Sequence, residues 1–182
     1  SKYKITKPYI MYVGAAYPHK NIEGLLRAWK IFQKKYGTEY ELVLVGKENF
    51  FYTKLKNTVI KESCDVVYTG FVPDDELSVL YRRSKLYVFP SLYEGFGLPP
   101  LEAMTHGIPV ASSQTSCLPE VLVDAALYFD PTNLNEMVDT LHKGITDHEI
   151  RRILNQNKAK VISRYSWTTL AKQTLDCYTR EY

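Results

Sequence analysis

The sequence has few cysteines, no long hydrophobic run and almost no net charge. Only three cysteines occur among 182 residues, and none form a C-x-x-C pair, so neither a disulfide framework nor a zinc finger is expected. No apolar run approaches the roughly 18–20 residues of a membrane-spanning helix. A net charge of +3 is too small to indicate nucleic-acid binding. The remaining composition is that of an ordinary globular protein, which predicts a single domain over residues 1–182.

The cysteines and the first residues also favour a cytoplasmic protein. Cys64, Cys117 and Cys177 lie more than fifty residues apart, which is typical of reduced thiols. The first four residues lack the charged-then-apolar plan of a signal peptide. The four histidines are scattered without metal-ligand spacing, so we expect no metal cofactor.

Short apolar segments alternate with amphipathic segments along the first 130 residues. The apolar segments predict buried strands at residues 9–13, 41–46, 66–70, 86–90, 108–111 and 126–129. The amphipathic segments predict helices at residues 22–36, 53–62, 73–83 and 98–106. This alternation is typical of an α/β fold: a Rossmann-like, doubly wound, six-stranded parallel sheet with helices on both faces. From residue 133 the strand signal stops, and two or three helices are expected as a flank or arm.

The segment that follows the fourth predicted strand carries the strongest chemical signal. Gly95 and Gly97 precede a helix, where uncovered backbone amides and the helix dipole favour phosphate. Glu94 and Glu102 flank them, and carboxylates accept hydrogen bonds from sugar hydroxyls. The combination indicates a nucleotide-sugar site. The alternative is that Glu94 is a solvated loop residue and Glu102 a favourable charge in the first turns of a helix.

Two further loops at strand ends are weaker candidates. Gly14 begins a loop that lacks the G-x-G-x-x-G fingerprint, and Lys20 lies at a helix start, where a positive charge suits a visiting anion or is simply exposed. Phe71 and Val72 follow the third strand and could form a wall for a nucleotide base or belong to the core. Asp74 and its neighbour Asp75 have the wrong spacing for a D-x-D metal site and fit a helix start instead.

These motifs occur in a fixed order that resembles a known family. Together they are similar to the C-terminal, donor-binding domain of the group 1 (family 4) retaining glycosyltransferases of GT-B architecture, over about residues 8 to 178. The residues that carry the resemblance are Gly14, Lys20-Asn21, Thr69-Gly70-Phe71-Val72, Phe89-Pro90-Ser91, Glu94-Gly95-Phe96-Gly97-Leu98-Pro99, Leu101-Glu102-Ala103-Met104, Gly107, Pro109-Val110, Pro119-Glu120-Val121, Asp124-Ala125-Ala126-Leu127 and Tyr165-Ser166-Trp167.

The resemblance implies roles for individual residues. Glu94 and Glu102 match the two glutamates of the family's E-x7-E motif, which implies that Glu94 contacts the donor sugar and Glu102 the ribose. Lys20 matches the basic residue that neutralises the departing diphosphate, an electrostatic role that needs no metal. The backbone amides that would meet the diphosphate or the sugar are those of Phe96, Gly97 and Leu98.

One position departs from the family pattern. Many members carry arginine directly after the first glycine of the first loop, where this chain has Ala15. One of the two usual phosphate-binding cations is therefore missing. Lys47, which follows the second strand, is the candidate replacement, with Arg82 and Arg83 as alternatives.

The expected function is the donor half of a glycosyltransferase. It would move a hexose from a UDP- or GDP-sugar to a glycan or lipid-linked acceptor, with no metal and no nucleic acid involved. The family's N-terminal acceptor domain is not found in these residues, so the isolated chain is expected to be inactive alone. A non-catalytic nucleotide-sugar-binding module is the alternative, and the missing glycine fingerprint disfavours an NAD-dependent oxidoreductase. Lys158, Lys160, Arg164 and Lys172 indicate a solvated helix face or peripheral contact with a membrane.

Overall fold

The computed structural model describes residues 2–58 and 65–180. Six strands form its sheet: β1 (Tyr9–Val13), β2 (Glu41–Val45), β3 (Val66–Gly70), β4 (Leu86–Phe89), β5 (Val110–Ser113) and β6 (Ala126–Phe129). The helices are η1 (Pro18–Lys20), α1 (Ile22–Tyr36), α2 (Phe50–Thr58), α3 (Asp74–Arg83), α4 (Leu98–Thr105), α5 (Leu118–Leu122), α6 (Leu134–Thr146), α7 (His148–Ile162) and α8 (Trp167–Arg180).

All six strands are parallel, and their order in the sheet is β3-β2-β1-β4-β5-β6. The side chains of β1, β2, β4 and β5 are almost entirely buried, whereas β3 at the edge is half-buried along its length. This follows from the position of the central strands, which are covered on both faces and therefore consist of near-continuous apolar residues. The predicted doubly wound α/β class is confirmed.

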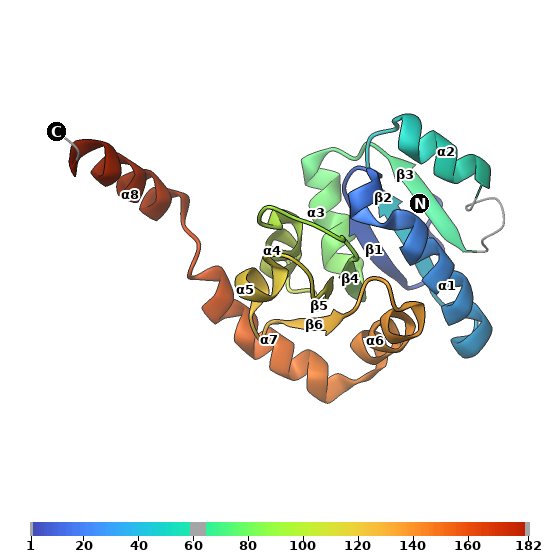
Figure 1. Cartoon of the computed structure of the whole chain (residues 1–182). Helices are drawn as coiled ribbons and strands as arrows, with labels where there is room; N and C mark the ends of the chain where they lie inside the picture. The colour runs from blue at the N-terminus through green and yellow to red at the C-terminus, as the bar shows by residue number, and fades with distance from the viewer. Residues whose placement is uncertain (1, 59–64, 181–182) are drawn as a thin grey trace.

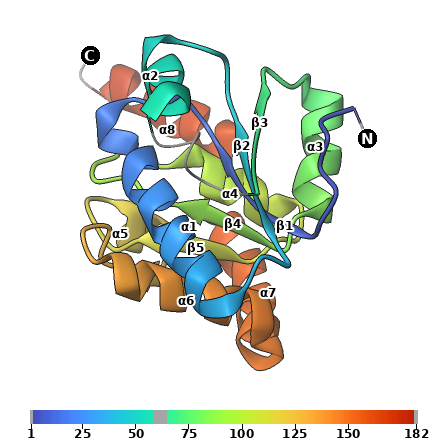
Figure 2. The same ribbon diagram turned by 90° about the vertical axis from the view of Figure 1, so that its right-hand side faces the viewer.

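The helices cover the sheet in two layers. In Figure 1, α1, α2 and α6 lie on one side of the strands, and α3, α4 and α5 lie on the other. Helix α6 packs along α1 and also contacts β4, β5 and β6, and Figure 2 shows α1 and α6 side by side. Trp29 and Phe32 of α1 are fully buried and stack with their ring centroids 4.8 Å apart. The core therefore lies on both faces of the sheet.

The strand order reverses direction between β1 and β4. Strand β1 leads into α1 on one face, while β4 leads into α4 on the other face. The loops that leave these two neighbouring strands therefore diverge at the carboxyl edge of the sheet. In open α/β sheets this topological switch point is where ligands bind.

The last two helices leave the layered body. Helix α7 crosses below α5 and α6 in Figure 1 and contacts both α4 and α6. Helix α8 has no buried residue and extends away from the sheet. Among the helices in the described ranges, none combines the length and the apolar character that crossing a membrane requires.

The predicted elements differ from the observed ones in a few places. Helix α2 begins at Phe50, earlier than predicted, because the Asn49 side chain accepts a hydrogen bond from the Tyr52 amide at 3.0 Å and caps the helix. The predicted end of this helix, residues 59–62, lies outside the described residues. Strand β5 begins at Val110, two residues later than predicted, since Pro109 has no amide to donate to the ladder.

Two further expectations about the second half of the chain need correction. The short helix α5 was not predicted. Within the described residues three helices follow residue 133, but α6 is not a flank, because Met137, Val138 and Leu141 are buried against the sheet layer. Helix α8 extends from the body as an arm.

Candidate functional site

The loops that leave β1 and β4 meet at the switch point through an ion pair. Lys20 Nζ lies 2.6 Å from Glu94 Oε1, and the two side chains are only 20% and 10% exposed. Lys20 belongs to η1, directly before α1, whereas Glu94 lies 74 positions later in the loop before α4. The fold therefore brings together the residue expected at the departing diphosphate, Lys20, and the residue expected at the donor sugar, Glu94. The ammonium also lies 5.7 Å from the centroid of the Phe89 ring.

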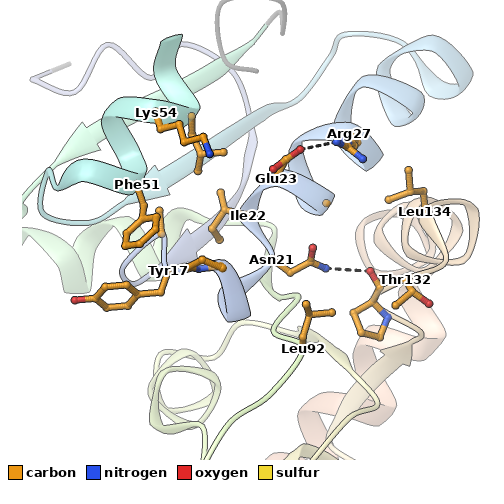
Figure 3. A pocket seen from close by; sticks show the side chains of 15 residues that line it. Tyr17, Asn21, Ile22, Glu23, Arg27, Phe51, Lys54, Leu92, Thr132 and Leu134 are labelled. Carbon is orange, nitrogen blue, oxygen red and sulfur yellow. Dashed lines mark hydrogen bonds and ion pairs between the residues drawn. The ribbon is translucent and has the colours of Figure 1, made fainter. Parts of the chain in front are cut away.

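Backbone and amide hydrogen bonds fix the distance between these two loops. The Leu92 amide donates to the His19 carbonyl at 2.7 Å. Asn21 adopts the left-handed conformation, with φ of 56°, and its side-chain amide donates to the carbonyls of Pro90 and Pro131 at 3.2 and 3.0 Å. Figure 3 shows the contact between Asn21 and the segment before α6 as a dashed line. A single side chain thus joins the loops that follow β1, β4 and β6.

The start of α4 directly follows the loop that carries Glu94. Gly97 caps the helix with φ of 93°, and proline follows in the first turn. Within residues 2–58 and 65–180, the amides of Gly95, Phe96 and Gly97 donate no hydrogen bond to a protein acceptor. Such unpaired donors at the positive end of a helix dipole form a site that favours an anion.

The loop between β5 and α5 holds the Glu94 loop from one side. Ser116 Oγ donates to the Glu94 carbonyl at 2.7 Å, and Cys117 Sγ lies 3.3 Å from the same oxygen. Ser113 Oγ and Thr115 Oγ1 both donate to the Ser91 carbonyl, at 2.6 and 3.0 Å. We name residues 113–117 the hydroxyl loop. It fixes the backbone of the segment whose side chain pairs with Lys20.

Tyrosine hydroxyls support the first loop from below. Tyr12 donates to the Ala15 carbonyl and Tyr52 to the Gly14 carbonyl, both at 2.9 Å. Burial raises the pKa of Tyr12 well above its ordinary value, and the negative charge of Glu94 raises it further. Gly14, with φ of 149°, is needed here because a β-carbon would lie 2.6 Å from the Tyr12 hydroxyl. These tyrosines remain neutral donors and hold the loop backbone in place.

The other predicted donor-binding residues lie around this centre. Glu102 is exposed on α4, and its charge adds to the burial that raises the pKa of Tyr81. Phe71 is 71% exposed after β3, whereas Val72 is buried at 4% in the core. Lys47 is exposed after β2. The structure therefore groups Lys20, Glu94 and the α4 start closely. It places Lys47 after β2, and Phe71 and Val72 after β3, at the same edge of the sheet. The roles of these residues stay predictions.

Two more predicted residues form an exposed apolar rim. Phe96 and Leu98 are 38% and 46% exposed, and the Phe96 ring meets the Tyr165 ring edge-on with centroids 5.2 Å apart. Across residues 2–58 and 65–180 there is no group of three or more His, Cys, Asp or Glu side chains placed to hold a metal ion. The polar groups that the structure brings together at this site are thus a cation, the carboxylate of Glu94 and backbone amides.

Sequence reasoning missed the hydroxyl loop and the tie made by Asn21. The run Ser112-Ser113-Gln114-Thr115-Ser116 directly after a strand was a usable signal, because hydroxyl side chains in turns bond to nearby carbonyls. Asn21 was identified only as part of a motif. Its three-loop contact depends on the positions of β4 and β6, which no local pattern reveals.

Comparison with protein families places this geometry in context. Residues 2–161 match the model for glycosyl transferases group 1. The chain belongs to this family. An Escherichia coli O-antigen chain mannosyltransferase B is 34% identical over 180 residues, which are 97% of this chain and 47% of that protein. The MMP alpha-(1->4)-mannosyltransferase of Mycolicibacterium hassiacum is 30% identical over 178 residues, 94% of this chain and 42% of that protein.

Solved structures agree with the assignment of this group 1 domain. Sucrose-phosphate synthase from Thermosynechococcus elongatus superposes with a TM-score of 0.82 at 25% identity, covering 96% of this chain and 45% of that one. The structure of TarM superposes with a TM-score of 0.80 at 19% identity, which shows the shared fold. The group 1 domain described here thus spans about half, or less, of the length of these relatives and is one half of a GT-B architecture.

Proposed function

We propose that this chain is the donor-binding half of a retaining mannosyltransferase that takes its sugar from UDP- or GDP-mannose. The observation that carries the proposal is the Lys20–Glu94 pair at the switch point, beside the unpaired amides at the start of α4. The family supplies the reaction type, and several relatives that match the chain are named as mannosyltransferases. The acceptor is proposed to be a glycan or a lipid-linked glycan at the cytoplasmic face of a membrane.

In the proposed reaction, Lys20 and backbone amides act on the departing diphosphate, while the two glutamates act on the hydroxyls of the donor. The bond between the anomeric carbon and the diphosphate oxygen breaks, and the acceptor hydroxyl forms the new bond to that carbon while its proton passes to the departing diphosphate. Negative charge then develops on the departing diphosphate, where Lys20 and the amides of residues 96–98 stabilise it. Glu94, held by the hydroxyl loop, accepts hydrogen bonds from the donor sugar, and Glu102 does so from the ribose.

The ion pair also gives Lys20 a partner while no donor is bound. A lysine at the start of a helix and without an anion nearby is opposed by the helix dipole. Glu94 compensates this charge at 2.6 Å. On donor binding, the diphosphate replaces the carboxylate as the partner of Lys20, and Glu94 becomes available to the sugar. Donor binding and the orientation of Glu94 are then coupled.

The test is a calorimetric titration of the chain with UDP, GDP, UDP-mannose and GDP-mannose. We expect one of the two diphosphates to bind, and its binding to weaken at least about tenfold in Lys20→Met, because an ion contact to phosphate is lost. Lys30→Met, a lysine of α1 outside the loop, is the matched control. Absence of binding by both diphosphates and by both sugar nucleotides would contradict the proposal.

A second assay separates the enzyme from a non-catalytic binding module. The chain is joined to its acceptor domain in the full-length protein, and mannose transfer is compared between wild type and Glu94→Ala. An enzyme loses transfer in the variant, whereas a binding module shows none in either. We expect the isolated chain to bind nucleotide and to transfer nothing, since the acceptor site lies in the other domain.

A further inference from the structure

A pocket of about 520 Å³ lies beside the Lys20–Glu94 centre, between the start of α1, the start of α2 and the segment before α6. Its volume falls within the range of about 300–1,000 Å³ typical of small-molecule sites. Figure 3 shows that Tyr17 and Phe51 close it on one side and Leu134 and Thr132 on the other, with Asn21 between them. With Leu92 from the loop after β4, four separate segments of the chain therefore contribute its walls.

The pocket is distinct from the proposed donor site but shares its loops. Tyr17 and Asn21 come from the loop that carries Lys20, and Leu92 comes from the loop that carries Glu94. Neither Lys20 nor Glu94 lines the pocket, because their side chains meet each other. The same two loops thus present one set of side chains to the reaction centre and another set to this pocket.

The lining combines aromatic rings with polar groups. The Tyr17 side chain is 47% exposed, and its ring meets the half-buried Phe51 ring edge-on with centroids 5.5 Å apart. Around the rings are the Thr132 hydroxyl and the Glu23–Arg27 pair, drawn with a dashed line in Figure 3. The amphipathic face of an exposed ring packs against C–H groups, while carboxylate, guanidinium and hydroxyl groups bond to hydroxyls.

The charges of this lining are mixed. Arg27 is paired with Glu23, and Lys54 adds a further cation to the wall. The pocket also differs from a purely apolar groove, because charged and hydroxyl groups line it. A ligand with both C–H faces and many hydroxyls matches these walls, since its hydroxyls can donate to the carboxylate and accept from the cations. That is the chemistry of a carbohydrate.

We propose that this pocket binds a segment of a glycan chain, remote from the bond that is formed. The inference rests on the proposed function, because a glycosyltransferase that extends a glycan meets such chains as acceptor and product. Binding there would hold the polymer close to the reaction centre, since Leu92 in the pocket wall donates its amide to the His19 carbonyl beside Lys20. The pocket then raises the local concentration of the acceptor chain.

The experiment is an NMR titration of the chain with an α-linked mannose trisaccharide, with GDP and UDP titrated separately. We expect the trisaccharide to shift the signals of Tyr17, Phe51 and Thr132. Its dissociation constant should rise about three- to tenfold in Tyr17→Ala and in Phe51→Ala, because each variant removes one ring contact. Phe50→Ala is the matched control: this neighbour is 74% exposed and does not line the pocket, so we expect less than a twofold change.

The outcomes distinguish this inference from the proposed function. If a nucleotide binds but the trisaccharide does not, or shifts only the Glu94 loop, the pocket proposal is wrong and the donor proposal stands. Equal trisaccharide affinity in wild type and Phe51→Ala also overturns it. If neither nucleotide nor trisaccharide binds, both proposals fail. Unchanged nucleotide affinity in Tyr17→Ala, together with weaker trisaccharide binding, supports two separate sites.

Discussion

Gly95 and Gly97 lie two residues apart in the loop before α4, and alanine at each position tests two different requirements. Gly97 has φ of 93°, and a β-carbon there would lie 2.7 Å from Cδ2 of the buried Leu118. The left-handed backbone costs a non-glycine residue about 1–2 kcal/mol, and displacing a packed core side chain costs about 1–3 kcal/mol. We therefore expect Gly97→Ala to lower the free energy of unfolding by about 2–5 kcal/mol.

At position 95 neither the backbone conformation nor a close neighbour requires glycine. Its φ is not positive, and a β-carbon would meet no heavy atom within 4 Å. Gly95→Ala should therefore change the free energy of unfolding by less than about 0.5 kcal/mol. The open space above Gly95 is where a ligand would approach the backbone, so the same variant should weaken nucleotide-sugar binding.

The assay is urea unfolding monitored by circular dichroism. The dependence of the unfolding free energy on urea concentration is compared between variants. A loss of 2–5 kcal/mol corresponds to a fall in melting temperature of about 2–4 °C for each kcal/mol in a chain of this size. Equal unfolding free energies for Gly95→Ala and Gly97→Ala would refute the reasoning. A stable Gly95→Ala variant with wild-type nucleotide-sugar affinity would refute the prediction about binding. Gly95 would then be needed neither for stability nor for the approach of the ligand.

Three further predictions follow from the same site and core. Glu94→Gln removes the carboxylate 2.6 Å from Lys20, so the diphosphate that the wild type binds, UDP or GDP, should bind about three- to tenfold tighter at low salt, with a smaller gain at high salt; calorimetry showing equal or weaker binding would contradict this. Ser116→Ala removes the 2.7 Å bond to the Glu94 carbonyl and should weaken binding of the sugar nucleotide but not of the diphosphate, and equal calorimetric affinities of wild type and variant for the sugar nucleotide would contradict this. Burial raises the pKa of Tyr9 and of Tyr68 to about 12, above an ordinary value of 10, so the stability they contribute is present below pH 10 and is lost between pH 10 and 12. Urea midpoints that stay constant across that pH range would argue against it.

The sheet could be predicted from the sequence because its signal is local. Each central strand is a short run of apolar residues, and α1 repeats its buried residues at helical spacing, as the full burial of Trp29 and Phe32 confirms. The role of α6 could not be predicted in this way. An amphipathic helix must bury its apolar face, but the sequence does not show whether that face meets α1, another chain or an arm.

The candidate site was predictable where a motif marks it and unpredictable where the fold assembles it. Glu94 and Gly97 were found because helix starts and glycines have local consequences. The pairing of Lys20 with Glu94 depends on β1 and β4 being neighbours, which is a property of the strand order. The contacts of Asn21 and Ser116 were missed because their partners lie far away in the sequence: 69 and 110 positions for Asn21, and 22 for Ser116.

The contrast between core and arm makes the two tryptophans of this chain spectroscopically different. Trp29 is fully buried within the α1 layer, and its indole nitrogen has no hydrogen-bond partner among the described residues. Trp167 begins α8 and is 75% exposed. An aqueous quencher such as iodide therefore reaches one emitter and not the other. Fluorescence can then follow the arm and the layered core separately in a single unlabelled sample.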